Sequence, residues 1–128
     1  MKNMRINKVT FTDKTIDQYS VIIDVRTPLE FKEDHIPGSL NYPVLTNKQR
    51  HEIGIKYKEN SFLAKKIGAQ LISNNIAKIL SKIKFDKKNS ILIYCWRGGL
   101  RSLSLYLVLK QIGYDSHLLD GGYKCYRR

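Results

Sequence analysis

The sequence predicts an α/β fold, in which a central, mostly parallel sheet of about five strands carries helices on both faces. Short apolar runs alternate with segments of helical periodicity, which is the pattern of strand–helix–strand units. Two of these runs are almost wholly apolar, as expected for strands buried on both faces. Since the chain has 128 residues, of which 42% are hydrophobic, we expect residues 1–128 to form a single domain with its own core.

The first two strands are predicted from short apolar stretches near the N-terminus. Residues 5–11 are expected to form an edge strand that ends in a polar turn at Thr12 and Asp13. Residues 21–25 read Val-Ile-Ile-Asp-Val. This apolar run with a single acid suits a strand that is buried on both faces.

A short helix and a third strand follow. Pro28 suits the first turn of a helix, which we place at residues 29–34. Residues 36–39 contain the Pro-Gly pair of a turn, and they lead to a brief strand at residues 40–42.

Residues 61–128 contain the two longest predicted helices, at residues 61–82 and 100–112, and Gly113 suits the C-cap of the second. Residues 91–94 form the predicted central strand, and residues 116–119 the last one, which a basic tail follows. The first helix is predicted from apolar side chains at three- and four-residue spacing: Phe62, Leu63, Ile67, Leu71, Ile72, Ile76, Ile79, Leu80 and Ile83.

The chain is strongly basic, with a formal net charge of +12. Residues 48–88 contain eleven Lys or Arg and three acids, so this segment holds about two-thirds of the excess charge. A basic surface attracts polyanions, of which nucleic acid is the commonest. The chain is also rich in Lys, Ile and Asn together, and a biased genome would produce that composition without any partner.

Several kinds of protein are not expected from this sequence. No run approaches the roughly 18 apolar residues of a membrane span, and no apolar signal-peptide segment follows the N-terminal residues. Two cysteines do not make a disulfide scaffold, which favours a reducing cytoplasm. No Cys/His group has zinc spacing, so no metal site is expected.

Cys95 is the candidate nucleophile, because of its surroundings. It ends an apolar strand and precedes Gly98, Gly99 and a helix start. Such a loop points backbone N–H groups inward, and the helix N-terminus adds partial positive charge. We therefore expect Cys95 to ionise readily and an anion to be held beside it. The alternative, an inert buried cysteine, fits this placement poorly.

The residues after Cys95 are expected to bind an anionic substrate. Arg101 lies six positions on, where its planar guanidinium can fold back onto an oxyanion. Arg97, at the loop apex, would meet substrate phosphate or solvent. Trp96 could stack on a base, shield an apolar chain, or simply pack the loop. The expected substrate- and anion-binding loop comprises Trp96, Arg97, Gly98, Gly99, Leu100 and Arg101.

Four further residues are candidates for supporting roles. Asp24 and Arg26 lie at the carboxyl end of a predicted parallel strand, where such sheets place their sites. We expect them to form an internal ion pair that braces the loop rather than to act in catalysis. His35 is expected to hydrogen-bond within its own turn. Cys125 is either a resolving thiol for Cys95 or an inert cysteine.

Two stretches resemble the paired signature of rhodanese-like domains. They read Asp-Val-Arg-Thr-Pro-Leu-Glu-Phe at residues 24–31 and His-Ile-Pro-Gly-Ser-Leu-Asn at residues 35–41. Cys95 stands where that family has its active cysteine, and residues 118–122 resemble its last strand and turn. The resemblance covers nearly the whole chain. It implies a rhodanese-like fold and a Cys95 that passes through a persulfide or selenopersulfide.

A narrower resemblance is to the N-terminal domain of tRNA 2-selenouridine synthases. It rests on the loop at residues 94–102, the insert at residues 50–58 and the Gly-Gly-Tyr-Lys sequence at residues 121–124. That family replaces sulfur by selenium at 2-thiouridine in the tRNA wobble position, by way of a geranylated intermediate. The resemblance implies a transferase with tRNA as partner, selenophosphate or a persulfide donor as co-substrate, and no bound cofactor.

The second domain of that family carries a phosphate-binding loop of the Gly-x-x-x-x-Gly-Lys-Ser/Thr type. No glycine in this chain has that spacing. The resemblance therefore implies half of a split enzyme or a lone domain, which would need a separate phosphate-binding-loop domain or chain for the full reaction.

Three other functions remain open on the sequence alone. Cys95 and Arg101 have the Cys-x5-Arg spacing of phosphatases, some of which share the rhodanese fold, although no His precedes the cysteine. The chain could also be a tRNA-binding or docking module with an idle cysteine, recognising phosphates through its charge. The last alternative is a thiosulfate or persulfide sulfurtransferase that does not act on RNA.

Overall fold

The computed structural model describes residues 6–10 and 16–127, and it confirms the predicted α/β fold. Its five-stranded sheet has the order β1-β5-β4-β2-β3, and every neighbouring pair is parallel. The predicted first strand is shorter than expected, and the predicted turn at Thr12 and Asp13 lies outside the described residues. The strands are β1 (Lys8–Val9), β2 (Val21–Asp24), β3 (Leu40–Asn41), β4 (Ser90–Tyr94) and β5 (Asp115–Leu119).

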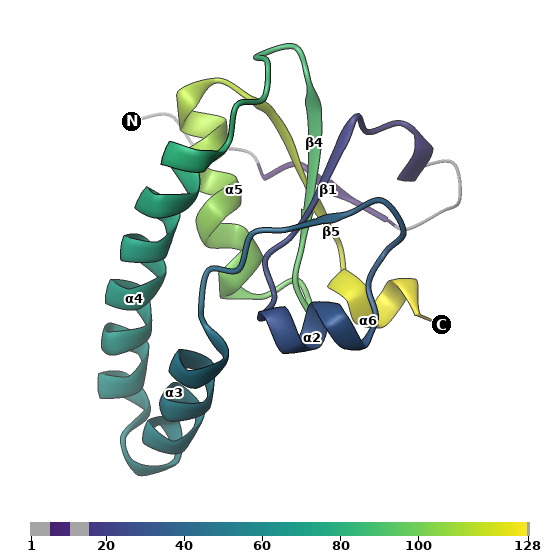
Figure 1. The fold of residues 1–128 in the computed structure, drawn as a ribbon. Helices are drawn as coiled ribbons and strands as arrows, with labels where there is room; N and C mark the ends of the chain where they lie inside the picture. The colour runs from purple at the N-terminus through teal and green to yellow at the C-terminus, as the bar shows by residue number, and fades with distance from the viewer. Residues whose placement is uncertain (1–5, 11–15, 128) are drawn as a thin grey trace.

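Helices lie on both sides of the sheet, as Figure 1 shows. The long helices α4 and α5 cover one face, while α6 and the segment after α2 cover the other. In the described part of the chain, no helix is long and apolar enough to cross a lipid bilayer. The described helices are α2 (Pro28–Glu33), α3 (Asn47–Glu59), α4 (Ser61–Lys82), α5 (Leu100–Ile112) and α6 (Gly122–Tyr126).

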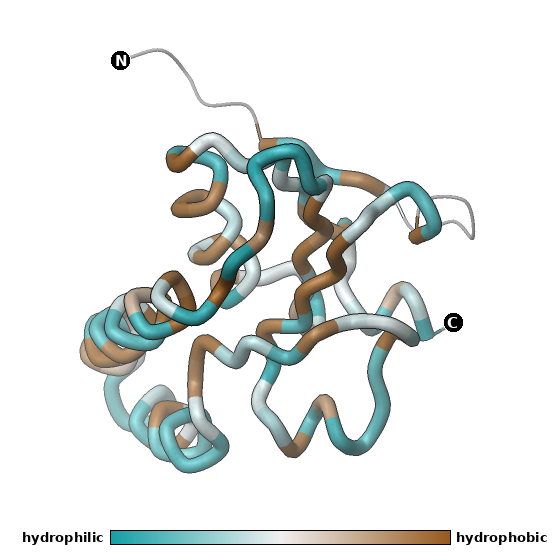
Figure 2. Tube along the Cα trace, turned by 45° about the horizontal axis from the view of Figure 1, so that its top comes forward, coloured by the Kyte–Doolittle hydropathy of each residue, from teal (hydrophilic) through white to brown (hydrophobic). Residues whose placement is uncertain are grey.

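The central strands are apolar on both faces because helices or loops cover each side. Ile23 and Ile93 point toward α4 and α5, whereas Ile22 and Leu92 point to the opposite core with Tyr123. Successive strand side chains alternate between faces, so a strand with two covered faces needs a continuous apolar run. The strands accordingly form the hydrophobic centre of Figure 2, with hydrophilic residues along the outer helices and loops.

Local sequence signals account for the helix ends. Thr27 caps α2 through its side chain, which accepts from the Glu30 amide, and the Glu30 side chain accepts from the Thr27 amide in return. Pro28 occupies the first turn of α2, as predicted. Gly113 ends α5 in the left-handed conformation, with φ of 118°. Helices α4 and α5 have the predicted bounds.

Helix α3 was not predicted, since none of its side chains is buried and it shows no strong apolar stripe. A capping box between Thr46 and Gln49 marks its start, and it packs antiparallel against α4 with Asn60 between them. The predicted apolar stripe of α4 is only partly buried, because Phe62, at the distal end of this hairpin, is 78% exposed. The predicted basic tail contains the short helix α6.

Candidate functional site

Cys95 follows the last residue of the central strand β4, and it is buried. The Gly99 amide donates to its Sγ at 3.2 Å, which places the N-cap of α5 beside the sulfur. The Ser102 hydroxyl lies 3.1 Å from Sγ and donates to the Gly99 carbonyl at 3.2 Å. No side-chain hydrogen bond caps α5, so the amides of its first turn, next to this loop, have no side-chain cap as a partner. The contact with Ser102 was not predicted.

A cavity of about 530 Å³ opens beside Cys95. It brings together five of the six residues of the predicted anion-binding loop with the thiol, and it adds one arginine from α3 that the sequence did not assign to the site. Three arginines therefore line the cavity beside one buried thiol, an arrangement suited to an anionic substrate. The lining residues are Arg50, Cys95, Trp96, Arg97, Gly99, Leu100 and Arg101.

Arg101 is held by Glu30 of α2. Its guanidinium donates to the two carboxylate oxygens at 2.9 and 3.4 Å. Arg50 approaches the same carboxylate, with Nε 3.6 Å from Oε1. Glu30 thus lies between two arginines of the cavity and fixes their positions. The expected contact of Arg101 with an oxyanion remains a prediction, and the partner Glu30 was not foreseen.

These contacts shift the pKa of Glu30. Burial alone would raise it, but the hydrogen bond and charge of Arg101, the Thr27 amide and the charge of Arg50 lower the pKa to about 2. Because the pKa of Glu30 is lowered in the folded state, its ionised carboxylate stabilises the protein at pH values above the usual pKa of 4.5. This stabilisation is lost as the pH falls toward 2.

We expect Glu30→Gln to remove this acid-sensitive contribution, on the order of 2 kcal/mol at neutral pH. Urea unfolding of wild type and variant over that pH window measures it. The wild-type free energy of unfolding should fall more steeply with acid than that of the variant. Glu33→Gln, which removes an exposed carboxylate from the same helix, is the control and should leave the slope unchanged. Equal slopes for all three proteins would contradict the expectation.

Trp96 packs on α6 and also lines the cavity. Its ring centroid lies 5.8 Å from that of Tyr123, and the Arg127 guanidinium lies 5.4 Å from its centroid. The side chain is half-buried, so the packing role considered for it is present. Its stacking on a substrate base remains a prediction. Arg97 is exposed at the loop apex.

The start of α6 holds the Cys95 loop in place. The Tyr123 amide donates to the Cys95 carbonyl at 2.7 Å, and the Lys124 amide donates to the Trp96 carbonyl at 2.9 Å. Gly122, with φ of 60°, packs so closely that a Cβ would lie 2.3 Å from the Cys95 carbonyl oxygen. Gly98, with φ of 70°, faces this turn. The two consecutive glycines before Tyr123 were a signal for such an approach, but no role was predicted for them.

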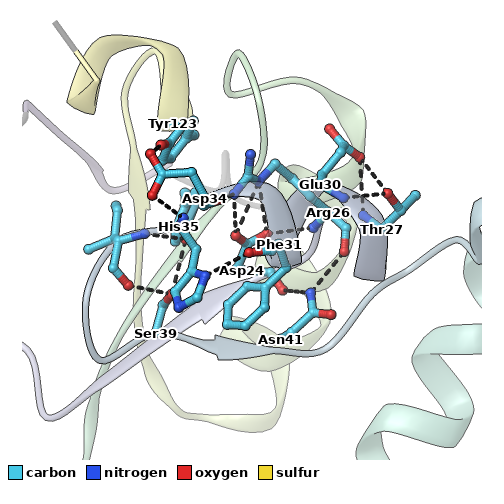
Figure 3. A network of polar contacts seen from close by, with 12 residues as sticks. Asp24, Arg26, Thr27, Glu30, Phe31, Asp34, His35, Ser39, Asn41 and Tyr123 are labelled. Atoms are coloured by element: carbon cyan, nitrogen blue, oxygen red, sulfur yellow. Dashed lines mark hydrogen bonds and ion pairs between the residues drawn. The ribbon is translucent and has the colours of Figure 1, made fainter.

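Asp24 and Arg26 form the expected ion pair, shown in Figure 3. Arg26 Nη2 lies 2.8 Å from Asp24 Oδ2, and both side chains are almost fully buried. The same guanidinium donates to the Asp34 carbonyl at 2.7 Å and lies 4.2 Å from the Tyr123 ring centroid. Tyr123 in turn donates its hydroxyl to the Asp34 carboxylate. The pair therefore links the end of β2 to α2 and α6, beside the Cys95 loop.

The two remaining candidates lie outside the cavity lining. His35 donates from Nδ1 to the Phe31 carbonyl at 2.7 Å and stacks on the Phe31 ring, so its contacts are local, as predicted. Cys125 is an exposed free thiol on α6. Among the described residues, no group of three or more His, Cys, Asp or Glu side chains could hold a metal ion.

Comparison with known proteins decides the family. The model of the rhodanese-like domain matches residues 9–128. The chain belongs to the rhodanese-like family. In that family it is similar to the tRNA 2-selenouridine synthase of Psychromonas ingrahamii, with 38% identity over 110 residues, and to that of Shewanella pealeana, with 34% identity over 131 residues. These matches cover 84% and 98% of this chain, but only 30% and 36% of those proteins.

Solved structures support the rhodanese-like fold. The N-terminal domain of a Clostridium difficile 630 protein is 35% identical, with a TM-score of 0.81 and coverage of 96% of both chains. A rhodanese-related protein from Thermoplasma volcanium, 20% identical with a TM-score of 0.59, shares the fold over 94% of this chain and 90% of its own. The chain thus spans about a third of the length of its curated relatives and corresponds almost fully to one solved domain.

Proposed function

We propose that this rhodanese-like domain transfers sulfur or selenium through Cys95 as part of a tRNA 2-selenouridine synthase. The target would be 2-thiouridine at the tRNA wobble position. The observation that carries the proposal is the buried Cys95 thiol at a cavity lined by Arg50, Arg97 and Arg101. The similarity to synthases from two organisms supports tRNA modification as the setting.

In the proposed first step, the thiolate of Cys95 attacks the outer sulfur of a persulfide or thiosulfate donor. A new S–S bond forms at Cys95, and the donor's S–S bond breaks. The leaving group, a thiolate or sulfite, departs with the electron pair. The Gly99 amide, 3.2 Å from Sγ, is placed to hydrogen-bond the anionic sulfur, and the arginines are placed to bind the anionic donor.

The complete reaction requires more than this domain in our proposal. Selenium would arrive as selenophosphate, and a phosphate-binding-loop domain, in the same protein or a separate chain, would contribute the remaining chemistry. The relatives' greater length supports such an additional part. We place the reaction in the reducing cytoplasm, where a thiol such as Cys95 stays available.

Loading of Cys95 tests the chemistry. Incubation with thiosulfate should add one sulfur atom to the wild-type protein, seen by mass spectrometry of the intact chain. Cys95→Ser should abolish this addition, whereas Cys125→Ser, which removes the exposed thiol, should retain it. Loading that depends on Cys125 instead would contradict the assignment of the nucleophile.

The full activity is tested with 2-thiouridine tRNA, selenophosphate, this domain and its candidate partner domain. Formation of 2-selenouridine should require Cys95, and equal product with Cys95→Ala would overturn the catalytic proposal. The rival phosphatase function is tested with p-nitrophenyl phosphate. Turnover of that ester that is lost in Cys95→Ser would favour dephosphorylation over chalcogen transfer.

A further inference from the structure

A second cavity, of about 510 Å³, lies between the start of α2 and one face of α3. Arg50 lines both this cavity and the one beside Cys95, so the two hollows meet at its side chain. Leu29 of α2, which is 63% exposed, and Ile55 of α3 add apolar surface to the second cavity. A path therefore leads from the thiol along α3.

The residues of α3 that line this path occupy one helical face. Arg50, Gly54 and Lys58 are spaced by four residues, so they follow one another along the same side of the helix. Ile53 points to another side of the helix, where it approaches Gly68 of α4. One face of α3 thus packs on α4, and the other is left to the cavity. Because no side chain of α3 is buried, this open face contributes little to the stability of the helix.

Gly54 is the most informative residue of this face. It lies inside a helix, where glycine is less favourable than alanine. A Cβ at this position would meet no atom within 4 Å, so packing within the domain does not require the glycine. Because Gly54 has no side chain, the helix surface between Arg50 and Lys58 stays open, which permits close approach of another backbone.

We propose that this face of α3, defined by Arg50, Gly54 and Lys58, binds the backbone of the substrate RNA and leads it to Cys95. The inference rests on the proposed RNA substrate and assigns its binding surface. Helical rise places Arg50 and Lys58 about 12 Å apart. A stacked strand carries a phosphate roughly every 3.4 Å, so this span reaches several phosphates. The strong excess of positive charge in residues 48–88 complements such a strand.

The test measures binding of an anticodon stem–loop RNA that carries 2-thiouridine at the wobble position, over a series of KCl concentrations. Lys58→Ala should weaken binding about five- to tenfold and make the slope of log K against log[KCl] shallower by about 0.7. Lys58→Arg should restore both. Lys48→Ala is the matched control, because Lys48 lies on the same helix, highly exposed, and lines neither cavity. It should weaken binding much less than Lys58→Ala does.

Gly54→Ala separates a binding role from a structural one. It should raise Tm by about 3 °C and yet weaken RNA binding several-fold, because the added methyl group stands in the path. Unchanged RNA affinity in Gly54→Ala, or an unchanged salt slope in Lys58→Ala, would overturn the proposal. So would an acidic peptide that binds this face more tightly than the RNA does.

Loading of wild-type Cys95 with sulfur, measured alongside, distinguishes this inference from the proposed function. RNA binding that depends on Gly54 and Lys58, with a thiol that cannot be loaded, would support the surface and contradict the chemistry. Normal loading of Cys95, together with RNA binding that neither substitution changes, would support the chemistry and contradict the surface. A wild-type domain that does not bind the RNA would overturn both this surface and the RNA substrate.

Discussion

Gly122→Ala should lower the free energy of unfolding by about 3 kcal/mol and strongly reduce sulfur loading of Cys95. The added Cβ would lie 2.3 Å from the Cys95 carbonyl oxygen and 2.8 Å from the Gly98 nitrogen. Both are backbone atoms, which cannot rotate away as the end of a side chain can. The start of α6 must therefore move, and the hydrogen bond from the Tyr123 amide to the Cys95 carbonyl is lost.

Gly38→Ala is the matched control for this prediction. Gly38 also has a positive φ, of 83°, but a Cβ added there would meet no atom within 4 Å, so only backbone strain of about 1 kcal/mol is expected. Urea unfolding and mass-spectrometric loading with thiosulfate measure the two effects. If Gly122→Ala loads Cys95 as fast as Gly38→Ala does, contact with α6 does not shape the reactive loop.

Asp24→Ala should lower the free energy of unfolding by about 3–5 kcal/mol. The substitution leaves the Arg26 guanidinium buried without the carboxylate that accepts from its backbone amide, Nε and Nη2. Removal of one partner of a buried pair costs more than the pair contributes, because an uncompensated charge remains. Denaturant unfolding measures the change.

Two further variants make the Asp24 prediction specific. Glu52→Ala breaks an exposed pair with Lys48 and should cost less than about 0.5 kcal/mol. The double variant Asp24→Asn/Arg26→Met removes both charges and should recover part of the loss seen in Asp24→Ala. Equal losses in Asp24→Ala and Glu52→Ala would show that the buried pair does not brace the end of β2.

The parts of the fold that were predicted correctly depend on local sequence. Apolar spacing gave the bounds of α4, and Gly113 marked the end of α5, because both signals lie within the element or directly beside it. Helix α3 was not predicted because it buries no side chain, so no apolar periodicity follows the capping box of Thr46 and Gln49 at its start. Exposure of Phe62 also could not be foreseen, since periodicity does not show how far a helix extends past the sheet.

The candidate site likewise has a part that the local sequence predicts and a part that it does not. Cys95 and its loop were recognisable because strand, glycines and helix start follow one another directly. Glu30, Arg50 and Gly122 were missed because their contacts with that loop join distant segments. Only the fold brings α2, α3 and α6 to the same edge of the sheet, and nothing in the local pattern of Glu30 indicates which arginine it will hold.

The order in which a ribosome makes this chain bears on its reactive loop. The loop at Cys95 is synthesised before Tyr123 and Lys124, whose amides bind the Cys95 and Trp96 carbonyls. Strand β1 likewise has to await β5, its partner in the sheet. A nascent chain that ends before residue 123 has the thiol but neither of these donors. The working geometry of the thiol therefore arises after translation of nearly the whole domain, and an interrupted product would carry a cysteine without its shaped surroundings.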